Sequence, residues 1–266
     1  MLSIKRHVVS AAALLAAMMY TSHSNSAELG DFYNLGPRPA ETAIRVGAVA
    51  VVGQRYQGSS EQKVLAVPGI FLHAANGLFA DPLNGIGYSF EQLGGLQYGL
   101  RVNIETGRSE EDTLPGFEKI KARANPGVFA NYAVNDKLTL RSALRLGMGE
   151  GADGSLLHLG GSYKVFQAGF FGVSMNASLK FADSNYMQSY FGVSPVQSAA
   201  SGLKAYRPSA GFAAAKVGLT AGTPLSRHIF VFTNLSVQRL LGDAANSPIV
   251  SKKLQPTAFV GGVYTF

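Results

Sequence analysis

The last stretch of the chain, Gln255–Phe266, reads QPTAFVGGVYTF and alternates between two kinds of side chain. Counting back in twos from Phe266 gives a row that includes Tyr264 and Val260, while the residues between them form a smaller, more polar row. Alternation with period two is typical of a β-strand whose two faces meet different surroundings. The strand belongs either to an ordinary soluble sheet or to a membrane barrel with lipid on its apolar side, and the rest of the chain decides between them.

Composition favours the membrane barrel. Hydrophobic residues make up 47% of the 266 residues and charged residues only 15%, which is little charge for a soluble domain. Beyond the first 27 residues, no run approaches the roughly 18 apolar residues of a membrane helix. Abundant apolar residues without long apolar runs are what alternating strands produce. The chain has no Cys, which excludes disulfides, thiolate metal sites and a lipid anchor on cysteine.

The first 27 residues have the features of an export signal. Lys5 and Arg6 precede an apolar core, Val8–Met19, and the small residues of 22–27 offer a cleavage site. The core is too short to span a bilayer as a helix. We therefore expect residues 1–27 to be removed and residues 28–266 to form the mature domain. Loss of Lys5 and Arg6 leaves 21 basic and 16 acidic residues, so the net charge falls from +7 to +5.

Segments with strand periodicity recur along the mature chain. In several of them, apolar residues alternate with small, polar or basic ones over ten or more positions. That length suits a tilted strand that crosses a membrane. Pro68 lies inside the second segment and marks either a bulge or an edge-like position. We predict an antiparallel transmembrane β-barrel of twelve strands, with ten as the alternative, over Ile44–Val52, Val64–His73, Gly77–Ala80, Gly85–Phe90, Leu96–Glu105, Asn125–Val134, Lys137–Gly147, Leu156–Val165, Phe170–Phe181, Gly211–Gly222, His228–Arg239 and Gln255–Phe266.

The connections between the later strands alternate between short and long. Asn135-Asp136 and 223–227 are short, whereas 182–210 and 240–254 are long. Outer-membrane barrels have short periplasmic turns and longer external loops. This parity predicts that both termini lie on the periplasmic side, and that the long loop 182–210 lies outside, where it can fold over a narrow lumen.

The end of the chain carries a second membrane feature. A strand that closes on Phe266, with Tyr264 two residues earlier, is similar to the assembly signal of bacterial outer-membrane barrels. We therefore expect outer-membrane lipid and the barrel-assembly machinery as partners, and no nucleic acid. The predicted location is the outer membrane of a Gram-negative bacterium.

Charges are distributed unevenly between strands and loops. Most carboxylates lie in predicted loops, while the strands carry basic residues on their polar rows, opposed there by Glu105. An Arg or Lys facing lipid near the bilayer midplane would cost about 2–4 kcal/mol, so these side chains should face the lumen. They either hydrate the lumen and pair with loop carboxylates, or they make it favour anions. The candidate lumen basic row is Arg101, Arg141, Arg145, Lys164, Lys180 and Lys216.

Catalytic, metal and cofactor motifs are missing from the sequence. There is no HExxH, Walker loop or G-x-S-x-G elbow, and the spacing of His73, His158 and His228 from carboxylates does not indicate a pair. The acidic cluster Glu110–Asp112 is either a solvated loop tip or a site for a divalent cation. We expect no catalytic residue, no metal and no cofactor. An enzyme assembled at the rim from distant strands, using His158 or His228, is the remaining alternative.

Three loop segments carry a more specific signal. Ser189–Leu203 reads SYFGVSPVQSAASGL, Arg239–Val250 reads RLLGDAANSPIV, and Tyr56–Ser60 reads YQGSS. Together they resemble the MipA/OmpV family of outer-membrane proteins, among them a protein that interacts with a lytic transglycosylase. The resemblance covers nearly the whole mature chain except the loop 106–121. Its motif residues are Tyr190, Phe191, Gly192, Pro195, Ser198, Arg239, Gly242, Asp243 and Pro248.

The resemblance implies a non-enzymatic barrel that acts as a scaffold in peptidoglycan biosynthesis, joining a lytic transglycosylase to a penicillin-binding protein. A small, anion-preferring, porin-like pore and a surface adhesin are the alternatives. The strand parity puts the motif loops on the outer side, whereas murein enzymes lie on the inner side. These loops therefore either have an external role or fold onto the barrel and serve its own structure. In the second case Asp243 would pair with a lumen arginine, and Pro195 and Pro248 would fix the course of the loops.

Overall fold

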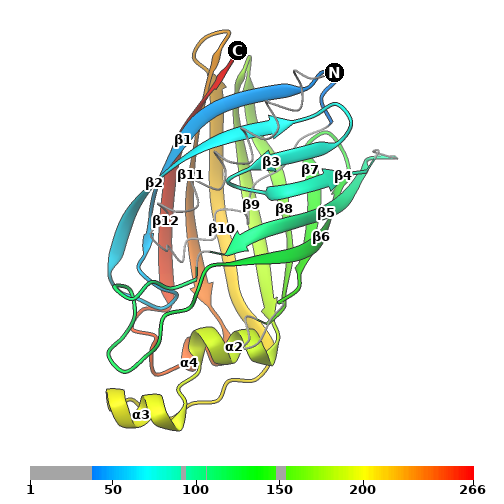
Figure 1. The fold of residues 1–266 in the computed structure, drawn as a ribbon. Coiled ribbons are helices and arrows are strands. Elements are labelled where there is room, and N and C mark those ends of the chain that lie inside the picture. The colour runs from blue at the N-terminus through cyan, green and yellow to red at the C-terminus, as the bar shows by residue number, and fades with distance from the viewer. Residues whose placement is uncertain (1–37, 91–93, 106, 148–153) are drawn as a thin grey trace, which may run out of the picture.

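A computed structural model describes residues 38–266, apart from 91–93, 106 and 148–153. Twelve antiparallel strands form a closed barrel (Figure 1), which confirms the predicted fold class and shows that the ten-stranded alternative is wrong. The predicted export signal, residues 1–27, lies outside the described residues. The strands are β1 (Ala43–Gln54), β2 (Gln62–His73), β3 (Leu78–Asp81), β4 (Gly85–Ser89), β5 (Leu96–Glu105), β6 (Arg123–Ala133), β7 (Leu138–Arg145), β8 (Leu156–Ala168), β9 (Phe171–Ala182), β10 (Gly211–Pro224), β11 (Ile229–Leu240) and β12 (Leu254–Thr265).

The last strand closes the barrel on the first. β12 lies between β11 and β1, with Val46 opposite Tyr264. The predicted alternation is present in β12, because Val260 and Tyr264 are exposed while Val263 is buried. Successive side chains of a strand point to opposite faces of the sheet, so one face of this strand belongs to the outside of the barrel and the other to the lumen.

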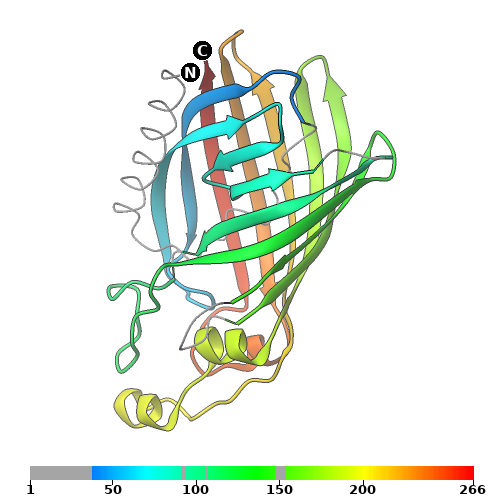
Figure 2. The ribbon, with the colours of Figure 1, turned by 45° about the vertical axis from the view of Figure 1, so that its right-hand side comes forward.

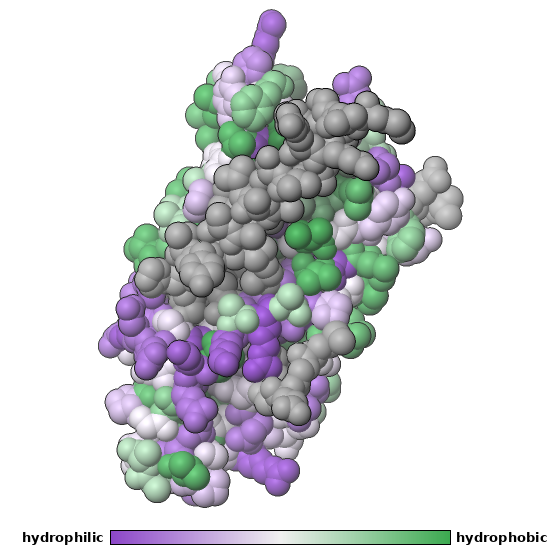
Figure 3. All heavy atoms as spheres, viewed as in Figure 1, coloured by the Kyte–Doolittle hydropathy of each residue, from purple (hydrophilic) through white to green (hydrophobic). Residues whose placement is uncertain are grey.

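Large apolar side chains cover the outside of the barrel. Leu100, Leu140, Met175 and Val217, each from a different strand, are all about half exposed or more. In Figure 3 the hydrophilic side chains gather at the lower end of the molecule, over the long loops and helices, and hydrophobic ones lie higher on the wall. The outer face therefore has an apolar band with a polar end, as a barrel in a membrane requires. No helix among the described residues is long and apolar enough to cross a membrane.

The two ends of the barrel differ. The end called inner here carries the start of β1, the end of β12 and short connections such as 169–170 between β8 and β9. The end called outer here carries the long connections and all the described helices (Figures 1 and 2). The predicted parity of short and long connections is thus confirmed.

Three short helices at the outer end were not predicted. They are α2 (Ser184–Phe191), α3 (Pro195–Ser201) and α4 (Gly242–Asn246). The sequence contains signals for the first two. Asp183 accepts a hydrogen bond from the Tyr186 N–H at the start of α2, and Ser194 and Gln197 form a capping box at the start of α3. Pro195 occupies the first turn of α3, where its missing N–H costs nothing.

The wall is incomplete beside β2. β3 and β4 have 4 and 5 residues, and β3 pairs with β2 only at Leu72 and His73. The backbone N–H and C=O groups of successive residues in an antiparallel strand point to opposite neighbours. The Ala74 N–H donates to the Leu78 carbonyl, so the N–H and C=O groups of even-numbered β2 residues face β3. Pro68 is one of these residues and stays in continuous register with β1. Having no N–H to offer, it suits the open edge. Of the two predicted readings of Pro68, the edge-like position is confirmed and the bulge is wrong.

Candidate functional site: the barrel lumen and its outer cap

One side of the lumen contains a packed apolar cluster. We call the inward faces of β12, β1 and β2, together with the β3–β4 turn, the apolar wall. Val49, Val51, Phe71, Leu83 and Val263 form a buried cluster there. Full burial of such side chains contributes about 1.5–3 kcal/mol each, so this side of the lumen is a packed core rather than a water-filled channel.

The opposite side, called the polar wall, consists of the inward faces of β7 to β11. No Asp or Glu occurs in the sequence of any strand from β7 round to β1. The polar wall carries Arg141, Lys180 and Lys216 on inward-facing positions. The strands of the polar wall themselves supply no carboxylate to these cations.

Pairing places these cations close together. On one rung of the barrel Arg141 lies opposite Gly160, Gly160 opposite Ser178, and Ser178 opposite Lys216. On the next rung towards the outer end, His158 lies opposite Lys180. Lys180 is buried, with 4% of its surface exposed. The polar wall therefore concentrates positive charge around two small residues.

A layer of amides and hydroxyls lies on the inner side of these cations. Asn176 and Asn234 each donate from Nδ2 to the Thr220 hydroxyl oxygen, both at 2.9 Å. The three residues come from β9, β11 and β10, so the bonds tie adjacent strands together across the lumen face. Both asparagines are buried, where a hydrogen bond is needed to offset the cost of desolvation.

The remaining predicted basic residues lie elsewhere on the inward row. Arg145 pairs with Glu105, with 3.1 Å between Nη1 and Oε2, and Glu105 also accepts from the Asn125 amide at 3.0 Å. The Arg101 guanidinium lies 6.0 Å from the centre of the Phe129 ring. Lys164 is exposed near the inner end of β8. The predicted basic row is thus not uniform: Arg145 is ion-paired, Arg101 lies beside an aromatic ring, Lys164 is exposed, and the other three form the cluster on the polar wall.

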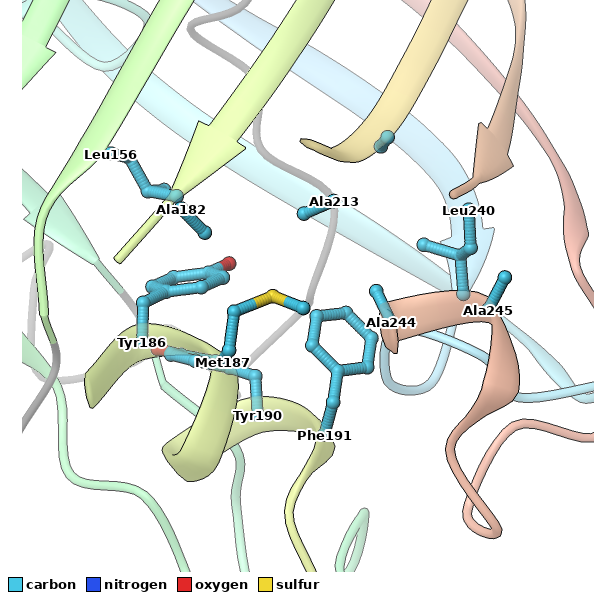
Figure 4. Packing of buried hydrophobic residues seen from close by; sticks show 11 residues of the cluster. Leu156, Ala182, Tyr186, Met187, Tyr190, Phe191, Ala213, Leu240, Ala244 and Ala245 are labelled. Carbon is cyan, nitrogen blue, oxygen red and sulfur yellow. The ribbon is translucent and has the colours of Figure 1, made fainter. Parts of the chain in front are cut away.

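The outer mouth is filled by a hydrophobic cluster that we call the cap (Figure 4). Tyr186, Met187 and Phe191 of α2 are fully buried and point towards the barrel and towards α4. They pack against the lumen-facing residues nearest the outer ends of β8 to β11, so the cap lies inside the mouth of the barrel. The residues of the cap are Leu156, Ala182, Tyr186, Met187, Tyr190, Phe191, Ala213, Ala214, Leu240, Ala244 and Ala245.

Polar contacts hold the cap to its surroundings. The Gln57 amide donates to the Tyr186 hydroxyl at 2.8 Å, and the rings of Tyr186 and Tyr190 stack with 4.3 Å between their centres. The Arg145 guanidinium lies 5.7 Å from the centre of the Tyr186 ring. The Ser247 hydroxyl donates to the Phe191 carbonyl at 2.5 Å. These contacts connect the motif near Tyr56 with both C-terminal motif loops.

The β5–β6 loop adds a second layer at the outer end. Arg108 is buried, and its guanidinium lies 5.9 Å from the Tyr56 ring centre and 5.8 Å from that of Phe117. Burial lowers the pKa of Arg108 from its ordinary value. Gly116 has positive φ and lies so close to α3 that an added Cβ would be 2.9 Å from the Ala200 Cβ. The loop is therefore packed against the rest of the outer end.

The acidic cluster in this loop is not a uniform, solvated tip. Asp112 is buried and forms ion pairs with Arg55 at 3.1 Å and Lys63 at 3.0 Å. Burial alone would raise the pKa of Asp112, but hydrogen bonds from Ser109, Lys63 and Arg55 outweigh it and the pKa is lowered. No group of three or more potential metal ligands occurs in the part of the chain that the structure describes. The solvated-tip reading holds for the exposed Glu110 and fails for Asp112.

The family-motif residues lie at the outer end and serve the structure there. Tyr190, Phe191 and Gly192 are buried. The Asp243 carboxylate accepts from the Ser209 N–H at 2.8 Å, so the predicted pairing of Asp243 with a lumen arginine is wrong. The other motif residues lie in α3, at the end of β11 or around α4: Pro195, Ser198, Arg239, Gly242 and Pro248.

One histidine pair was missed in the sequence. His73 Nε2 lies 3.2 Å from the buried Asp81 Oδ2, and Asp81 Oδ1 accepts from the backbone N–H groups of Leu83 and Asn84. The expectation that no histidine pairs with a carboxylate is therefore wrong. His73 lies opposite Phe79 in the β2–β3 pairing, and Asp81, two residues beyond Phe79, is the next residue on the same face, so the register of β3 brings the two side chains together.

The histidines named in the enzyme alternative are far apart in the fold. His158 lies on the polar wall, opposite Lys180. His228 is exposed at the inner end, where its ring stacks on Tyr264 with 5.6 Å between centres. The described residues do not bring the two together.

Comparison with protein families gives one extended match. A family described as "MltA-interacting protein MipA" matches residues 46–266, which include every strand from within β1 to the end of the chain. A search of curated proteins found no significant match.

Solved barrels are similar in shape but distant in sequence. NanC porin is 8% identical over 85% of this chain and all of its own length, with a TM-score of 0.42. OmpT of Vibrio cholerae is 8% identical over 85% of this chain and 97% of its own, with a TM-score of 0.38. The CymD monoaromatic hydrocarbon channel is 8% identical over 85% of this chain and 89% of its own, with a TM-score of 0.43. Similarity at this level does not indicate what this barrel binds.

Proposed function

The chain belongs to the MipA family, and on that premise we propose that it is an outer-membrane scaffold protein that binds a lytic transglycosylase of the MltA type. The match over residues 46–266 is the observation that carries this proposal. In the same proposal, a penicillin-binding protein is the second enzyme held by the scaffold. The barrel itself performs no reaction.

The apolar outer face supports a location in the outer membrane. A closed barrel satisfies most backbone hydrogen bonds between strands, which is what a spanning structure needs in lipid. In that location the inner end faces the periplasm, because short turns are periplasmic in such barrels. Murein enzymes act there, so the inner end is where they would bind.

The inner end offers exposed apolar side chains for such contacts. Phe170 in the β8–β9 turn is 83% exposed, and Leu225 in the β10–β11 turn is 68% exposed. Apolar side chains that protrude from turns are suited to a partner or to the membrane interface. The motif loops, by contrast, pack in the cap at the outer end. In this proposal they close the barrel and do not contact the murein enzymes.

Capture by the purified, detergent-extracted protein tests the scaffold. We expect an MltA-type transglycosylase to be retained, and Phe170→Ser with Leu225→Ser to reduce its retention. Val196→Ser is the matched control, since Val196 is 79% exposed on α3 at the outer end. If neither a transglycosylase nor a penicillin-binding protein is retained by the unaltered protein, the scaffold proposal fails.

A small anion-preferring pore is the second candidate, favoured by the absence of Asp and Glu from the strands β7 to β1. The cap occupies the outer mouth, so conduction would require the cap to move. Conductance measurements in planar bilayers distinguish a pore from a closed barrel. A pore would pass anions in preference to cations, and Arg141→Gln would reduce that preference. A silent barrel, or unchanged selectivity in Arg141→Gln, excludes this version.

A further inference from the structure

We propose that the outer ends of β11 and β12 form a binding site for an anionic, phosphate-bearing lipid of the outer leaflet. Arg239, Lys252 and Lys253 bind the headgroup of this lipid, and the outward-facing apolar side chains of β10 to β12 bind its acyl chains. We call this site the lipid rim. It rests on the outer-membrane location proposed above but not on the scaffold role, so either proposal can fail without the other.

The direction of Arg239 follows from its neighbour in β11. Leu240 is 1% exposed and belongs to the cap, so it faces the lumen. Successive side chains of a strand point to opposite faces, so Arg239 faces outward, and it is exposed. Packing in the cap therefore does not account for Arg239, although the two residues are adjacent in the chain.

Strand pairing places Arg239 directly beyond an apolar surface. Arg239 lies opposite Ala215 of β10 on one side and opposite Leu254 of β12 on the other. Four residues along a strand cover roughly 14 Å, which is the distance from Arg239 to the level of Leu235. The two outward-facing rungs within this distance are apolar: Val217, Val237 and Pro256 form the first, and Leu219, Leu235 and Ala258 form the second.

These apolar rungs are open to the surroundings of the barrel. Val217 is 60% exposed and Leu235 is 61% exposed. Leu254, on the same rung as Arg239, is 50% exposed. Apolar side chains in such a position are suited to acyl chains, and the guanidinium lies at the end of this apolar surface.

Two lysines extend the positive charge along the rim. Lys252 and Lys253 immediately precede β12, and both are exposed. The backbone of this pair is held on both sides. The Lys253 carbonyl accepts from the Leu240 N–H, and the Lys252 N–H donates to the Gly58 carbonyl, both at 2.9 Å. The lysines therefore stand on an anchored part of the rim, beside the outer end of β11.

The carboxylates of the two neighbouring loops are engaged elsewhere. Asp243 accepts from the Ser209 N–H at 2.8 Å, and Glu61 forms an ion pair with Arg55. Within the described part of the chain, none of the three cations of the lipid rim takes part in an ion pair. Their charge is therefore available to an anion outside the protein.

The chemistry of the three cations selects phosphate. Arg binds a phosphate group through two parallel hydrogen bonds, whereas Lys binds it as a compact point charge. Basic side chains beside an anionic membrane surface strengthen binding to it additively. A lipid holds its phosphate at the level where its acyl chains end, which is how Arg239 is placed relative to the apolar rungs. The lipid rim is therefore suited to a phosphorylated lipid rather than to a dissolved anion.

Native mass spectrometry of the full mature protein, released from detergent micelles that contain phosphatidic acid, tests the lipid rim. We expect the unaltered protein to retain phosphatidic acid in preference to phosphatidylcholine with the same acyl chains. Arg239→Gln with Lys252→Gln should lower this preference about tenfold or more, since two cations at an anionic surface are lost. Migration of the unheated barrel on a gel shows that each variant has folded.

Lys119→Gln with Lys204→Gln is the matched control, because it removes two positive charges from exposed positions in other loops of the outer end. It should leave the preference within about twofold, as expected for distant, solvent-screened charges. An equally large loss in this control would show that only net charge matters, and would overturn the lipid rim.

Other results would also overturn the proposal. One is equal retention of the two lipids by the unaltered protein, and another is an unchanged preference in folded Arg239→Gln/Lys252→Gln. A third is displacement of phosphatidic acid by inorganic phosphate at the same concentration, because the apolar rungs would then contribute nothing. Capture of the transglycosylase is measured separately and should be unchanged in Arg239→Gln/Lys252→Gln, since the proposed enzyme contacts lie at the inner end.

Discussion

The two walls of the lumen are built from strands of similar length and the same alternation, yet they differ in what faces inward. On β1 the inward residues include Val49 and Val51, which are 1% exposed and belong to a packed cluster. On β7 an inward position carries Arg141, opposite Gly160 on β8. The comparison teaches that the barrel separates its tasks between two sides of its lumen: one wall stabilises the fold, and the other holds charge.

The difference predicts different responses to substitution. Removal of a side chain from the apolar wall leaves a cavity in a close-packed core. Replacement of a cation on the polar wall by an apolar side chain of similar size leaves no cavity among apolar atoms. Substitutions on the apolar wall should therefore lower the stability of the fold more than substitutions on the polar wall.

The largest expected effect comes from Phe71→Ala on the apolar wall. Phe71 is 3% exposed, and loss of a buried Phe side chain costs about 3–5 kcal/mol. Urea unfolding of the barrel in lipid vesicles measures the loss. Leu100→Ala is the control, since Leu100 is 53% exposed on the outside of β5 and its truncation leaves no cavity in the lumen. Equal losses in the two variants would show that the apolar wall is not a core.

Asp112→Asn should have the next largest effect, because Asp112 fastens the β5–β6 loop to Arg55 and to Lys63 at the start of β2. We expect a loss of about 1–3 kcal/mol in the free energy of unfolding at pH 7. The pKa of Asp112 is lowered from its ordinary value of 3.8, so its contribution is present above that pH and is lost as the pH falls through the folded-state pKa.

The comparison of Asp112→Asn with the unaltered protein should therefore shrink as the pH is lowered below about 4. Glu111→Gln is the control, because Glu111 is exposed and only its backbone carbonyl contacts Arg55. A difference between Asp112→Asn and the unaltered protein that persists unchanged at the lowest pH would contradict the ion-pair account.

Asn234→Ala tests the polar wall with a smaller effect. It removes the donor to Thr220 without removing a charge, and a net hydrogen bond contributes about 1 kcal/mol. Gln167→Ala is the control, because the Gln167 amide donates to the Gly169 carbonyl in an exposed turn. Unfolding by urea should distinguish the two, with almost no change for Gln167→Ala. A loss as large as that of Phe71→Ala would mean that the polar wall is also a core.

The smallest effect is expected for Pro68→Ala, at the free edge of the apolar wall. The Pro68 nitrogen faces the side where β3 no longer pairs with β2, so a new N–H there gains no partner strand among the described residues. We expect a change within about 0.5 kcal/mol. Val67→Pro, one residue earlier, would instead remove a bond to β1 and cost about 3 kcal/mol. Similar results for the two would contradict the assigned edge.

Much of this fold could be predicted because alternation is visible in the sequence. The apolar row of β12 and the basic row of β7 follow directly from period two. The alternation of short and long connections predicted which loops lie together at each end of the barrel. Pro68 indicated an edge or a bulge, and only the short pairing of β3 with β2 decided between them.

Other features depend on contacts between distant segments. The cap joins Gln57 to Tyr186 across 129 positions, and no local pattern encodes that contact. The His73–Asp81 pair depends on the register in which β3 pairs with β2. The capping signals at Asp183 and Ser194 could have revealed α2 and α3, because a side chain that bonds back to the third residue of a helix is a local feature.

The free energies of unfolding of Phe71→Ala and Lys216→Met, measured side by side with urea in lipid vesicles, test the division of tasks between the walls most directly. The division predicts that Phe71→Ala loses about 3–5 kcal/mol, because it leaves a cavity in a packed core. Lys216→Met should lose much less, because Met keeps most of the side-chain volume. Equal losses in the two variants would contradict the division.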